Sequence, residues 1–363
     1  MSAERPSTDP GALPLPQRLA RQIEAGGPIS IAHYMAEANA HYYGGRDPLG
    51  EDGDFITAPE ISQMFGELVG LALADMWMRS GRRPNPLYVE LGPGRGTLAA
   101  DALRAMEGAA LAPRVHFVET SEALKARQRA LLPHITHHDS IDSLPTEGPL
   151  LVVANEFFDA LPIRQIVRTG SEWRERVVIR RESGDGIQFL PMPGYRQITS
   201  GLPPLAAQAQ DGAVIETPPA GAAIALTLAN RIARQGGGAI IIDYGYEGPA
   251  IGDTLQAVHR HRFVDPFRDP GEVDLTAHVD FTVIGNMARQ AGLRVLGPVG
   301  QGDFLRRLGI DVRAAQLAAA RPDHAEALEA ARQRLTADDQ MGTLFKAMAF
   351  VHPDWAEPAG FEG

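Results

Sequence analysis

Residues 87–96 read Leu-Tyr-Val-Glu-Leu-Gly-Pro-Gly-Arg-Gly, and this stretch indicates the fold class. Its apolar start predicts a buried strand, and its end places glycines at the alternate positions Gly92, Gly94 and Gly96. Residues 97–106 follow at once with a helical pattern. A strand, a tight glycine turn and a helix form the first unit of a nucleotide-binding βαβ fold. Glycine suits such a turn because a Cβ would keep a ligand away from the backbone.

Two details favour S-adenosylmethionine over NAD as the ligand of this turn. Thr97 stands where a dinucleotide fingerprint has its third glycine, and the acidic Glu90 precedes the first glycine by two positions. Glu119 ends the next predicted strand, where an acid can accept hydrogen bonds from ribose hydroxyls. The residues expected to bind the cofactor here are Glu90, Gly92, Gly94, Gly96 and Glu119. An ordinary structural turn is the alternative interpretation.

Strand-like and helix-like segments alternate along the chain, as in an α/β protein. Further strands are predicted at 115–119, 150–154, 239–243 and 344–351. Further helices are predicted at about 30–39, 65–77, 121–132, 221–234, 279–291 and 312–335. The helix at 65–77 is amphipathic and is interpreted as core packing. The alternation predicts a doubly wound, mostly parallel, Rossmann-like sheet with helices on both faces.

The chain is expected to divide into four segments. Residues 1–84 form an N-terminal helical extension with a lid loop, and residues 85–170 form the Rossmann-like core that binds the cofactor. Residues 171–222 are an inserted region with a β-hairpin, and residues 223–363 hold the rest of the sheet with a C-terminal helical elaboration. Residues 1–17 are polar, rich in proline and predicted to be loosely ordered.

The composition is that of an ordinary globular protein, with 44% apolar and 22% charged residues among 363. A net charge of −11 argues against broad nucleic-acid binding, which needs a basic face. The absence of cysteine excludes disulfides, thiolate nucleophiles and cysteine-based zinc sites. No helical His-x-x-x-His pair occurs, so no metal site is predicted.

The sequence predicts a cytoplasmic protein without stable membrane insertion. The N-terminus shows neither the apolar core of a signal peptide nor an arginine-rich, acid-free transit pattern. The most apolar longer stretch, residues 68–78, is interrupted by Asp75 and is too short to span a bilayer. The pattern carries no indication of the oligomeric state.

Acidic and amide side chains cluster after the predicted strand at 150–154. Residues 155–162 read Asn-Glu-Phe-Phe-Asp-Ala-Leu-Pro, and the carboxyl ends of strands face the ligand crevice of an open α/β sheet. Asn155, Glu156 and Asp159 are therefore candidates for binding the substrate or assisting methyl transfer. The alternative is a helix N-terminus, with Asn155 as its cap and the acids favoured by the helix dipole.

Two further places have both a structural and a functional interpretation. Thr57 fits a helix N-cap, Pro59 fits an early position in that helix, and Glu60 fits the acid of a capping box. The same residues also fit a lid that closes over the cofactor. Asp139 follows a short predicted strand, and it is either an acceptor for the adenine amino group or a solvated loop residue.

Five stretches together resemble the MidA-like methyltransferases, which include the mitochondrial complex I assembly factor 7 proteins. They are residues 53–62, 90–96, 155–162, 243–246 and 274–281. The resemblance covers nearly the whole chain and implies the class I S-adenosyl-L-methionine methyltransferase fold. Because the N-terminus lacks an organelle-targeting pattern, the chain resembles a bacterial-type member.

The resemblance implies a protein arginine N-methyltransferase that uses S-adenosyl-L-methionine. Its implied partner is a protein substrate, a subunit of respiratory complex I that corresponds to the 49 kDa quinone-module protein. Its implied product is symmetric dimethylarginine, which would support assembly of that complex.

For arginine methylation we expect carboxylates to hold the guanidinium group in a fork-to-fork ion pair. Glu156 is the first choice for this catalytic role, with Asp159 or Glu60 as the second carboxylate. Two other functions stay open as alternatives. One is an NAD-linked oxidoreductase, and the other is a non-catalytic assembly chaperone that retains the fold.

Overall fold

The structure is a computed structural model, and it describes residues 13–45, 57–184, 186–259 and 262–361. Most of the N-terminal region predicted to be loosely ordered, and the part of the motif at 53–62 that precedes Thr57, lie outside the described residues. The chain divides into two compact units. The core unit comprises Arg46–Asp159, Ala220–Gly248 and His278–Gly363. The accessory unit comprises Met1–Gly45, Ala160–Pro219 and Pro249–Ala277.

This grouping cuts across the four predicted segments. The predicted extension at 1–84 contributes to both units, because residues up to Gly45 belong to the accessory unit and later ones to the core unit. The accessory unit is also assembled from three separate stretches of chain. Segments drawn along the sequence therefore do not coincide with the compact units.

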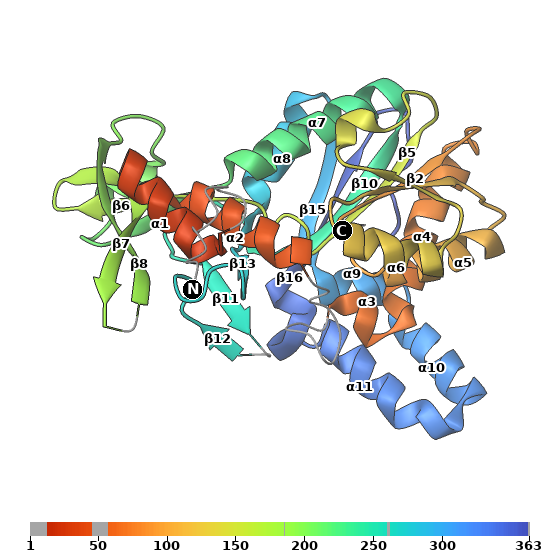
Figure 1. Cartoon of the computed structure of the whole chain (residues 1–363). Helices are drawn as coiled ribbons and strands as arrows, with labels where there is room; N and C mark the ends of the chain where they lie inside the picture. Colours follow the sequence, from red (N-terminus) through yellow and green to blue (C-terminus); the bar gives the residue numbers. More distant parts are fainter. Residues whose placement is uncertain (1–12, 46–56, 185, 260–261, 362–363) are drawn as a thin grey trace. The chain divides into compact units, whose positions relative to one another are not determined.

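The described residues of the core unit form an eight-stranded, mostly parallel sheet (Figure 1). In spatial order its strands are β15 (Arg294–Gly300), β16 (Phe345–Val351), β10 (Gly237–Tyr246), β5 (Leu150–Asn155), β2 (Leu87–Leu91), β3 (Arg114–Val118) and β4 (Ile135–His138), with β14 (Val279–Asp280) beside β10. Strands β10, β5, β2, β3 and β4 run parallel, and β16 is antiparallel to β10 and β15. The predicted fold class is confirmed.

The strand order reverses between β2 and β5, and this point positions the site. The chain runs outward from β2 to β3 and β4, and then returns to place β5 on the other side of β2. The parallel register pairs Leu91 of β2 with Ala154 of β5. The glycine turn after β2 and the acidic stretch after β5 therefore emerge at the same edge of the sheet, where open α/β folds bind ligands.

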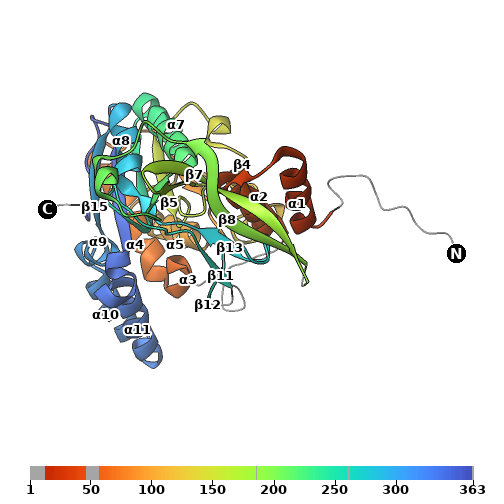
Figure 2. The ribbon, with the colours of Figure 1, turned by 90° about the vertical axis from the view of Figure 1, so that its left-hand side faces the viewer.

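Helices cover both faces of this sheet, with α7 and α8 on one face and α4 and α5 on the other (Figure 1). The helices of the core unit are α3 (Ala58–Ile61), α4 (Gln63–Arg79), α5 (Thr97–Gly108), α6 (Glu122–Leu131), α7 (Pro219–Gln235), α8 (Phe281–Gln290), α9 (Gln301–Arg307), α10 (Ile310–Ala320) and α11 (Ala325–Thr336). The late helices predicted at 312–335 are α10 and α11, which lie side by side (Figures 1 and 2). Strand β15, which contains Gly297 and Pro298, was not predicted.

Helix α4 is buried on nearly all sides rather than along one stripe. Its buried residues include Gly66 and Gly70 as well as the large apolar side chains. A Cβ on Gly66 would lie 2.9 Å from the carbonyl oxygen of Leu98, and one on Gly70 would lie 2.5 Å from that of Ala102. Helices α4 and α5 therefore pack backbone against backbone, and α4 is core as predicted.

The accessory unit has its own sheets and its own apolar core. Its described strands form a five-stranded sheet of β1 (Ile29–Ser30), β7 (Glu172–Ser183), β6 (Arg164–Thr169) and β9 (Val214–Thr217), with β8 (Gly186–Gln197) beside β7. A three-stranded sheet contains β12 (Arg262–Val264), β11 (Gln256–His259) and β13 (Asp274–Thr276). The predicted hairpin is confirmed as β7 and β8, the long curved ribbon of Figure 2.

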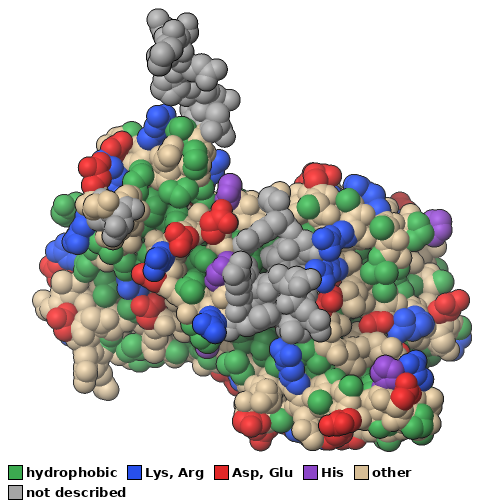
Figure 3. Space-filling view, turned by 60° about the horizontal axis from the view of Figure 1, so that its bottom comes forward, with side chains coloured by type: hydrophobic (Ala, Val, Ile, Leu, Met, Phe, Trp, Pro, Cys, Tyr) green, Lys and Arg blue, Asp and Glu red, His purple; other side chains and the backbone are tan. Residues whose placement is uncertain are grey.

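In the described part of the accessory unit, the α-helices are α1 (Leu15–Gly26) and α2 (Ile31–Gly45). Helix α1 was not predicted, and its start at Leu15 falls inside the stretch expected to be loosely ordered. Leu15, Leu19 and Ile23 of this helix are buried at helical spacing. Among the described residues, no helix is both long and apolar enough to span a membrane. On the face shown in Figure 3, basic and acidic side chains are interspersed.

Candidate cofactor and acceptor site

The glycine turn after β2 has a backbone conformation that other residues rarely adopt. Gly92, Gly94 and Gly96 have φ angles of +60°, +55° and +86°. A Cβ on Gly92 would lie 2.9 Å from the ring of Phe157, so space as well as conformation requires glycine there. Gly96 is the N-cap residue of α5, so the unpaired first N–H groups of that helix begin at the turn.

Glu90 lies on β2 just before this turn, and only 3% of its surface is exposed. The Tyr88 hydroxyl donates a hydrogen bond to Glu90 Oε2 at 2.7 Å. Burial raises the pKa of Glu90 to about 8, although the hydrogen bond from Tyr88 acts in the opposite direction. A cationic group placed over the turn would favour the ionised form of this carboxyl group.

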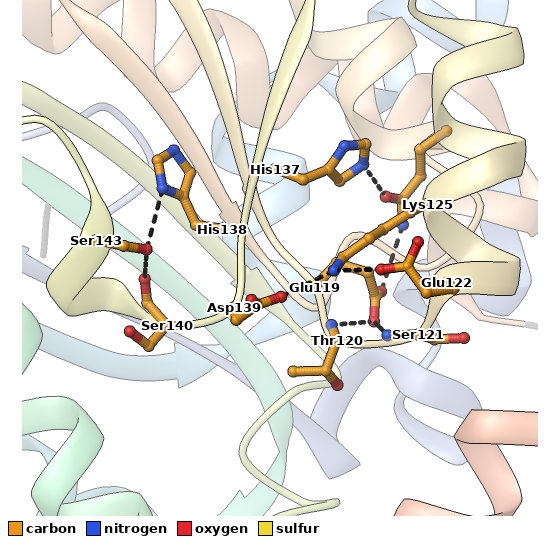
Figure 4. A network of polar contacts seen from close by, with 11 residues as sticks. Glu119, Thr120, Ser121, Glu122, Lys125, His137, His138, Asp139, Ser140 and Ser143 are labelled. Carbon is orange, nitrogen blue, oxygen red and sulfur yellow. Dashed lines mark hydrogen bonds and ion pairs between the residues drawn. The ribbon is translucent and has the colours of Figure 1, made fainter.

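Glu119 follows β3 directly, and its carboxylate is buried but not saturated with hydrogen bonds. Its Oε1 accepts the backbone N–H groups of Thr120 at 2.7 Å and Ser121 at 2.8 Å (Figure 4). Its Oε2 accepts a longer bond of 3.3 Å from Gln128 Nε2. Because a carboxylate has about four acceptor positions, Oε2 retains capacity for a ligand hydroxyl. Burial raises the pKa of Glu119.

Asp139 lies after β4, as predicted, and its side chain is 83% exposed. Its Oδ1 accepts a hydrogen bond from Lys125 Nζ at 2.8 Å (Figure 4). Lys125 also bonds Glu122 Oε1 at 2.8 Å. The hydrogen bond and charge of Lys125 lower the pKa of Asp139. The structure thus pairs the exposed carboxylate of Asp139 with the buried Lys125, and the contact of Asp139 with adenine stays a prediction.

Glu156 follows β5 with a φ angle of +49°, in the left-handed region that non-glycine residues seldom enter. Its Oε1 accepts the N–H of Ala58 and the side-chain amide of Asn155, each at 3.1 Å. The residue as a whole is partly exposed. No helix begins at this point of the described chain, so the alternative in which Asn155 is a helix cap is wrong.

The surroundings of Glu156 place its titration near neutral pH. Burial is the main cause that raises the pKa of Glu156 to about 7, and the negative charge of Asp159 contributes further. The hydrogen bonds from Ala58 and Asn155 act in the opposite direction. A carboxyl group that titrates near the working pH can exchange a proton during catalysis.

Asp243 of β10 fixes the turn that carries these acids, and its side chain is fully buried. Its Oδ2 accepts the backbone N–H groups of Phe157 at 3.2 Å, Phe158 at 3.0 Å and Asp159 at 3.2 Å. Its Oδ1 accepts the N–H of Tyr244 at 3.0 Å. The sequence predicted only that a strand ends at Asp243. Its anchoring role was missed.

The segment around α3 differs in part from its predicted cap. Thr57 is the N-cap residue by position, but its side chain makes no capping hydrogen bond, while Pro59 lies in the first turn as predicted. Glu60 Oε1 instead accepts a hydrogen bond from Thr97 Oγ1 at 2.7 Å, and Glu60 Oε2 lies 3.8 Å from Arg95 Nη1. The capping-box interpretation is therefore wrong, because Glu60 joins α3 to the start of α5. The lid role stays a prediction.

The residues of this site fit an S-adenosylmethionine ligand. Three left-handed glycines add no side chains of their own to the turn, and Glu119 keeps an acceptor position at the neighbouring strand end. Asn155 Oδ1 is buried without a hydrogen-bond partner among the described residues, so a polar ligand group could satisfy it. The described residues contain no group of three or more histidine and acidic side chains arranged to hold a metal ion.

The Rossmann-like sheet carries this glycine turn after β2, and acids follow both neighbouring strands, β3 and β5. Together these features define a methyltransferase that uses S-adenosyl-L-methionine. Comparison with known proteins identifies the family. Residues 68–299 match the family described as "Putative S-adenosyl-L-methionine-dependent methyltransferase". The chain belongs to this family, and S-adenosyl-L-methionine is its cofactor.

Curated relatives are similar over most of their length. The Drosophila melanogaster protein arginine methyltransferase NDUFAF7 homolog, mitochondrial, is 37% identical over 92% of this chain and 84% of its own. The human protein arginine methyltransferase NDUFAF7, mitochondrial, is 36% identical over 86% of this chain and 77% of its own. These names contradict the prediction of a cytoplasmic protein, since both relatives are mitochondrial.

A solved structure shows the same fold with a cofactor product. A Burkholderia thailandensis protein crystallised with S-adenosyl-homocysteine is 31% identical and superposes with a TM-score of 0.81. The match covers 100% of this chain and 96% of that one. This similarity supports the cofactor inferred from the glycine turn.

Proposed function

We propose that this protein is a protein arginine N-methyltransferase that uses S-adenosyl-L-methionine. The names of the relatives support the arginine acceptor. The observation that carries the proposal is the turn after β5, where Glu156 and Asp159 are held together by the backbone bonds to Asp243. Two carboxylates on one rigid turn can bind a guanidinium cation bidentately.

The residues of the chain have separate proposed tasks in binding. The cofactor is bound by Glu90, the glycine turn and Glu119. Asp139 contacts its adenine, and Thr57 and Pro59 belong to a segment that covers the bound cofactor. When bound, the cofactor supplies a methyl group that is attached to a sulfonium sulfur. An arginine nitrogen would attack the methyl carbon in line with the carbon–sulfur bond, which breaks. The protein mainly aligns donor and acceptor for this step.

Glu156 has the proposed catalytic task. Its Oε1 is held by Ala58 and Asn155, so Oε2 is the oxygen we assign to the guanidinium group. The arriving cation favours the ionised carboxylate. The nitrogen loses a proton when it is methylated, and Glu156 accepts this proton. Asp159 is the second carboxylate, whereas the bond from Thr97 to Glu60 makes Glu60 the weaker candidate.

The experiment is methyl transfer from labelled cofactor to arginine-containing protein, with mass spectrometry of the modified peptides. The Glu156→Gln variant should lose transfer while its affinity for S-adenosylhomocysteine stays nearly unchanged. In the natural enzyme, transfer should increase as the pH rises through about 7, because Glu156 then ionises. Unchanged transfer in the variant would sink the catalytic assignment, and loss of cofactor binding would show a structural role instead.

The same peptides identify the substrate. We propose that it is a subunit of respiratory complex I, that the product is symmetric dimethylarginine, and that the modification supports assembly of the complex. This rests on the resemblance to the complex I assembly factor 7 proteins. A modified arginine in an unrelated protein would contradict the proposed substrate. A chain that binds cofactor but modifies no protein would instead favour the alternative of an assembly chaperone.

A further inference from the structure

Gln128 of α6 is a fully buried amide that contacts two parts of the cofactor site. Its Nε2 donates a hydrogen bond to the carbonyl oxygen of Gly94 at 2.6 Å. The same nitrogen donates to Glu119 Oε2 at 3.3 Å. One side chain therefore links the glycine turn after β2 to the acid after β3.

His137 of β4 contacts the oxygen of this amide. Its Nε2 lies 2.8 Å from Gln128 Oε1. Because the Gly94 carbonyl can only accept, the amide nitrogen of Gln128 must face it and the amide oxygen must face His137. His137 therefore carries a proton on Nε2. Figure 4 shows His137 and Glu119 within this polar network.

We propose that Gln128 is a positioning residue for the cofactor, which holds the Glu119 carboxylate in place relative to the glycine turn. An apolar side chain would fill the same space on α6, as the buried Leu124 does one turn earlier. The amide adds directed bonds to two groups that face the ligand. This inference rests on the proposed contact of Glu119 with the ribose.

A double-mutant cycle tests the inference, with the affinity for S-adenosylhomocysteine measured by calorimetric titration of the full chain. Gln128→Met keeps the length of the side chain and removes its hydrogen bonds, so the affinity should fall about tenfold. Glu119→Gln should also weaken binding. If Gln128 acts through Glu119, the double variant should bind no more weakly than Glu119→Gln alone, within about twofold.

Gln301→Met is the matched control. Gln301 is also fully buried and donates to the Leu335 carbonyl oxygen at 2.9 Å, away from the cofactor residues. This control should lower the urea midpoint without changing the affinity. Should Gln128→Met fail to fold, His137→Leu replaces it in the cycle, because His137 is partly exposed and its removal takes away the 2.8 Å contact that holds Gln128 Oε1.

Two outcomes for the variants that carry Gln128→Met would overturn the inference. The first is that Gln128→Met binds S-adenosylhomocysteine with an affinity within about twofold of that of the natural protein. The second is that the decreases in affinity caused by the two single substitutions multiply in the double variant. The cycle measures binding alone, so a failure to methylate arginine would contradict the proposed function without affecting this result. Unchanged binding in Glu119→Gln would remove the proposed ribose contact and this inference together.

Discussion

Two glutamates with raised pKa values lie at the adjacent ends of β2 and β5, where the strand order reverses. Burial raises the pKa of Glu90 to about 8 and that of Glu156 to about 7. Glu90 is almost fully enclosed, whereas Glu156 is partly exposed. Glu90 is therefore suited to respond to a bound cation, and Glu156 is suited to exchange a proton with a substrate.

The raised pKa of Glu90 predicts a pH-dependent cost in stability. Between its ordinary value of 4.5 and about 8, the folded chain keeps a proton that the unfolded chain has lost. Stability should therefore fall as pH rises through this window, by up to about 1.4 kcal/mol per pH unit from this group. In urea unfolding, the free energy of unfolding of Glu90→Gln should rise relative to that of the natural protein as the pH increases from 5 to 8. If the difference in the free energy of unfolding between the two proteins did not depend on pH, this would contradict the raised pKa of Glu90.

Gly92 and Gly108 form a matched pair for the glycine turn. Gly92→Ala puts a Cβ 2.9 Å from the Phe157 ring at a φ of +60°, so the free energy of unfolding should fall by about 1–3 kcal/mol. Cofactor binding should weaken in the same variant. Gly108→Ala, at the end of α5, meets open space and should leave stability unchanged or raise it. Equal effects of the two substitutions would show that the turn does not need glycine.

At the scale of elements, the site depends on how β10 holds the end of β5. Three N–H groups of the 157–159 turn converge on one oxygen of Asp243. The buried carboxyl group of Asp243 therefore fixes the turn through backbone hydrogen bonds to its oxygens. The geometry of Glu156 and Asp159 therefore depends on a residue of a different strand.

Asp243→Ala should lower methyl transfer by about 100-fold, because the freed turn misplaces both acids. The affinity for S-adenosylhomocysteine should change little, and Asp243→Asn, which keeps one acceptor oxygen, should recover part of the rate. Asp280→Ala is the control, since Asp280 also accepts two backbone N–H groups but caps α8. That control should cost about 1 kcal/mol of stability and keep the transfer rate. Equal rate losses in both alanine variants would indicate a general effect of unfolding.

The elements also show which patterns can be predicted. Strands β2, β5 and β10 were predicted because their apolar runs are buried on both faces of the sheet. Strand β15 was missed because it is only partly buried and contains Gly297 and Pro298, which weaken a strand pattern. Helix α1 was missed because the prolines around it resemble loosely ordered chain, although its apolar side chains reach the core of the accessory unit.

At the scale of the whole molecule, cofactor binding should stabilise the folded chain. A ligand at about 100 times its Kd adds about 2.7 kcal/mol to the free energy of unfolding. S-adenosylhomocysteine should therefore raise the Tm in a thermal scan, and NAD at the same concentration should not. Glu156→Gln should keep this shift and Gly92→Ala should reduce it. A Tm increase with NAD but not with S-adenosylhomocysteine would contradict the cofactor.

The sequence alone determined the fold class and the cofactor turn. A left-handed glycine turn between a buried strand and a helix is a local requirement, and Gly92, Gly94 and Gly96 express it directly in the chain. The acids at strand ends were also predictable, because parallel strands direct their carboxyl ends to one edge of the sheet. Asn155, Glu156 and Asp159 were named on this basis.

Only the tertiary structure decided what those residues contact. Asp243 lies 86 positions from Phe157 in the chain, and Gln128 lies 34 positions from Gly94, so no local pattern links either pair. The bond from Thr97 to Glu60 likewise replaced a capping role that the local spacing favoured. The pKa of Glu156 depends on burial and on a neighbouring charge. Such properties arise from groups that packing brings together, and spacing along the chain does not contain them.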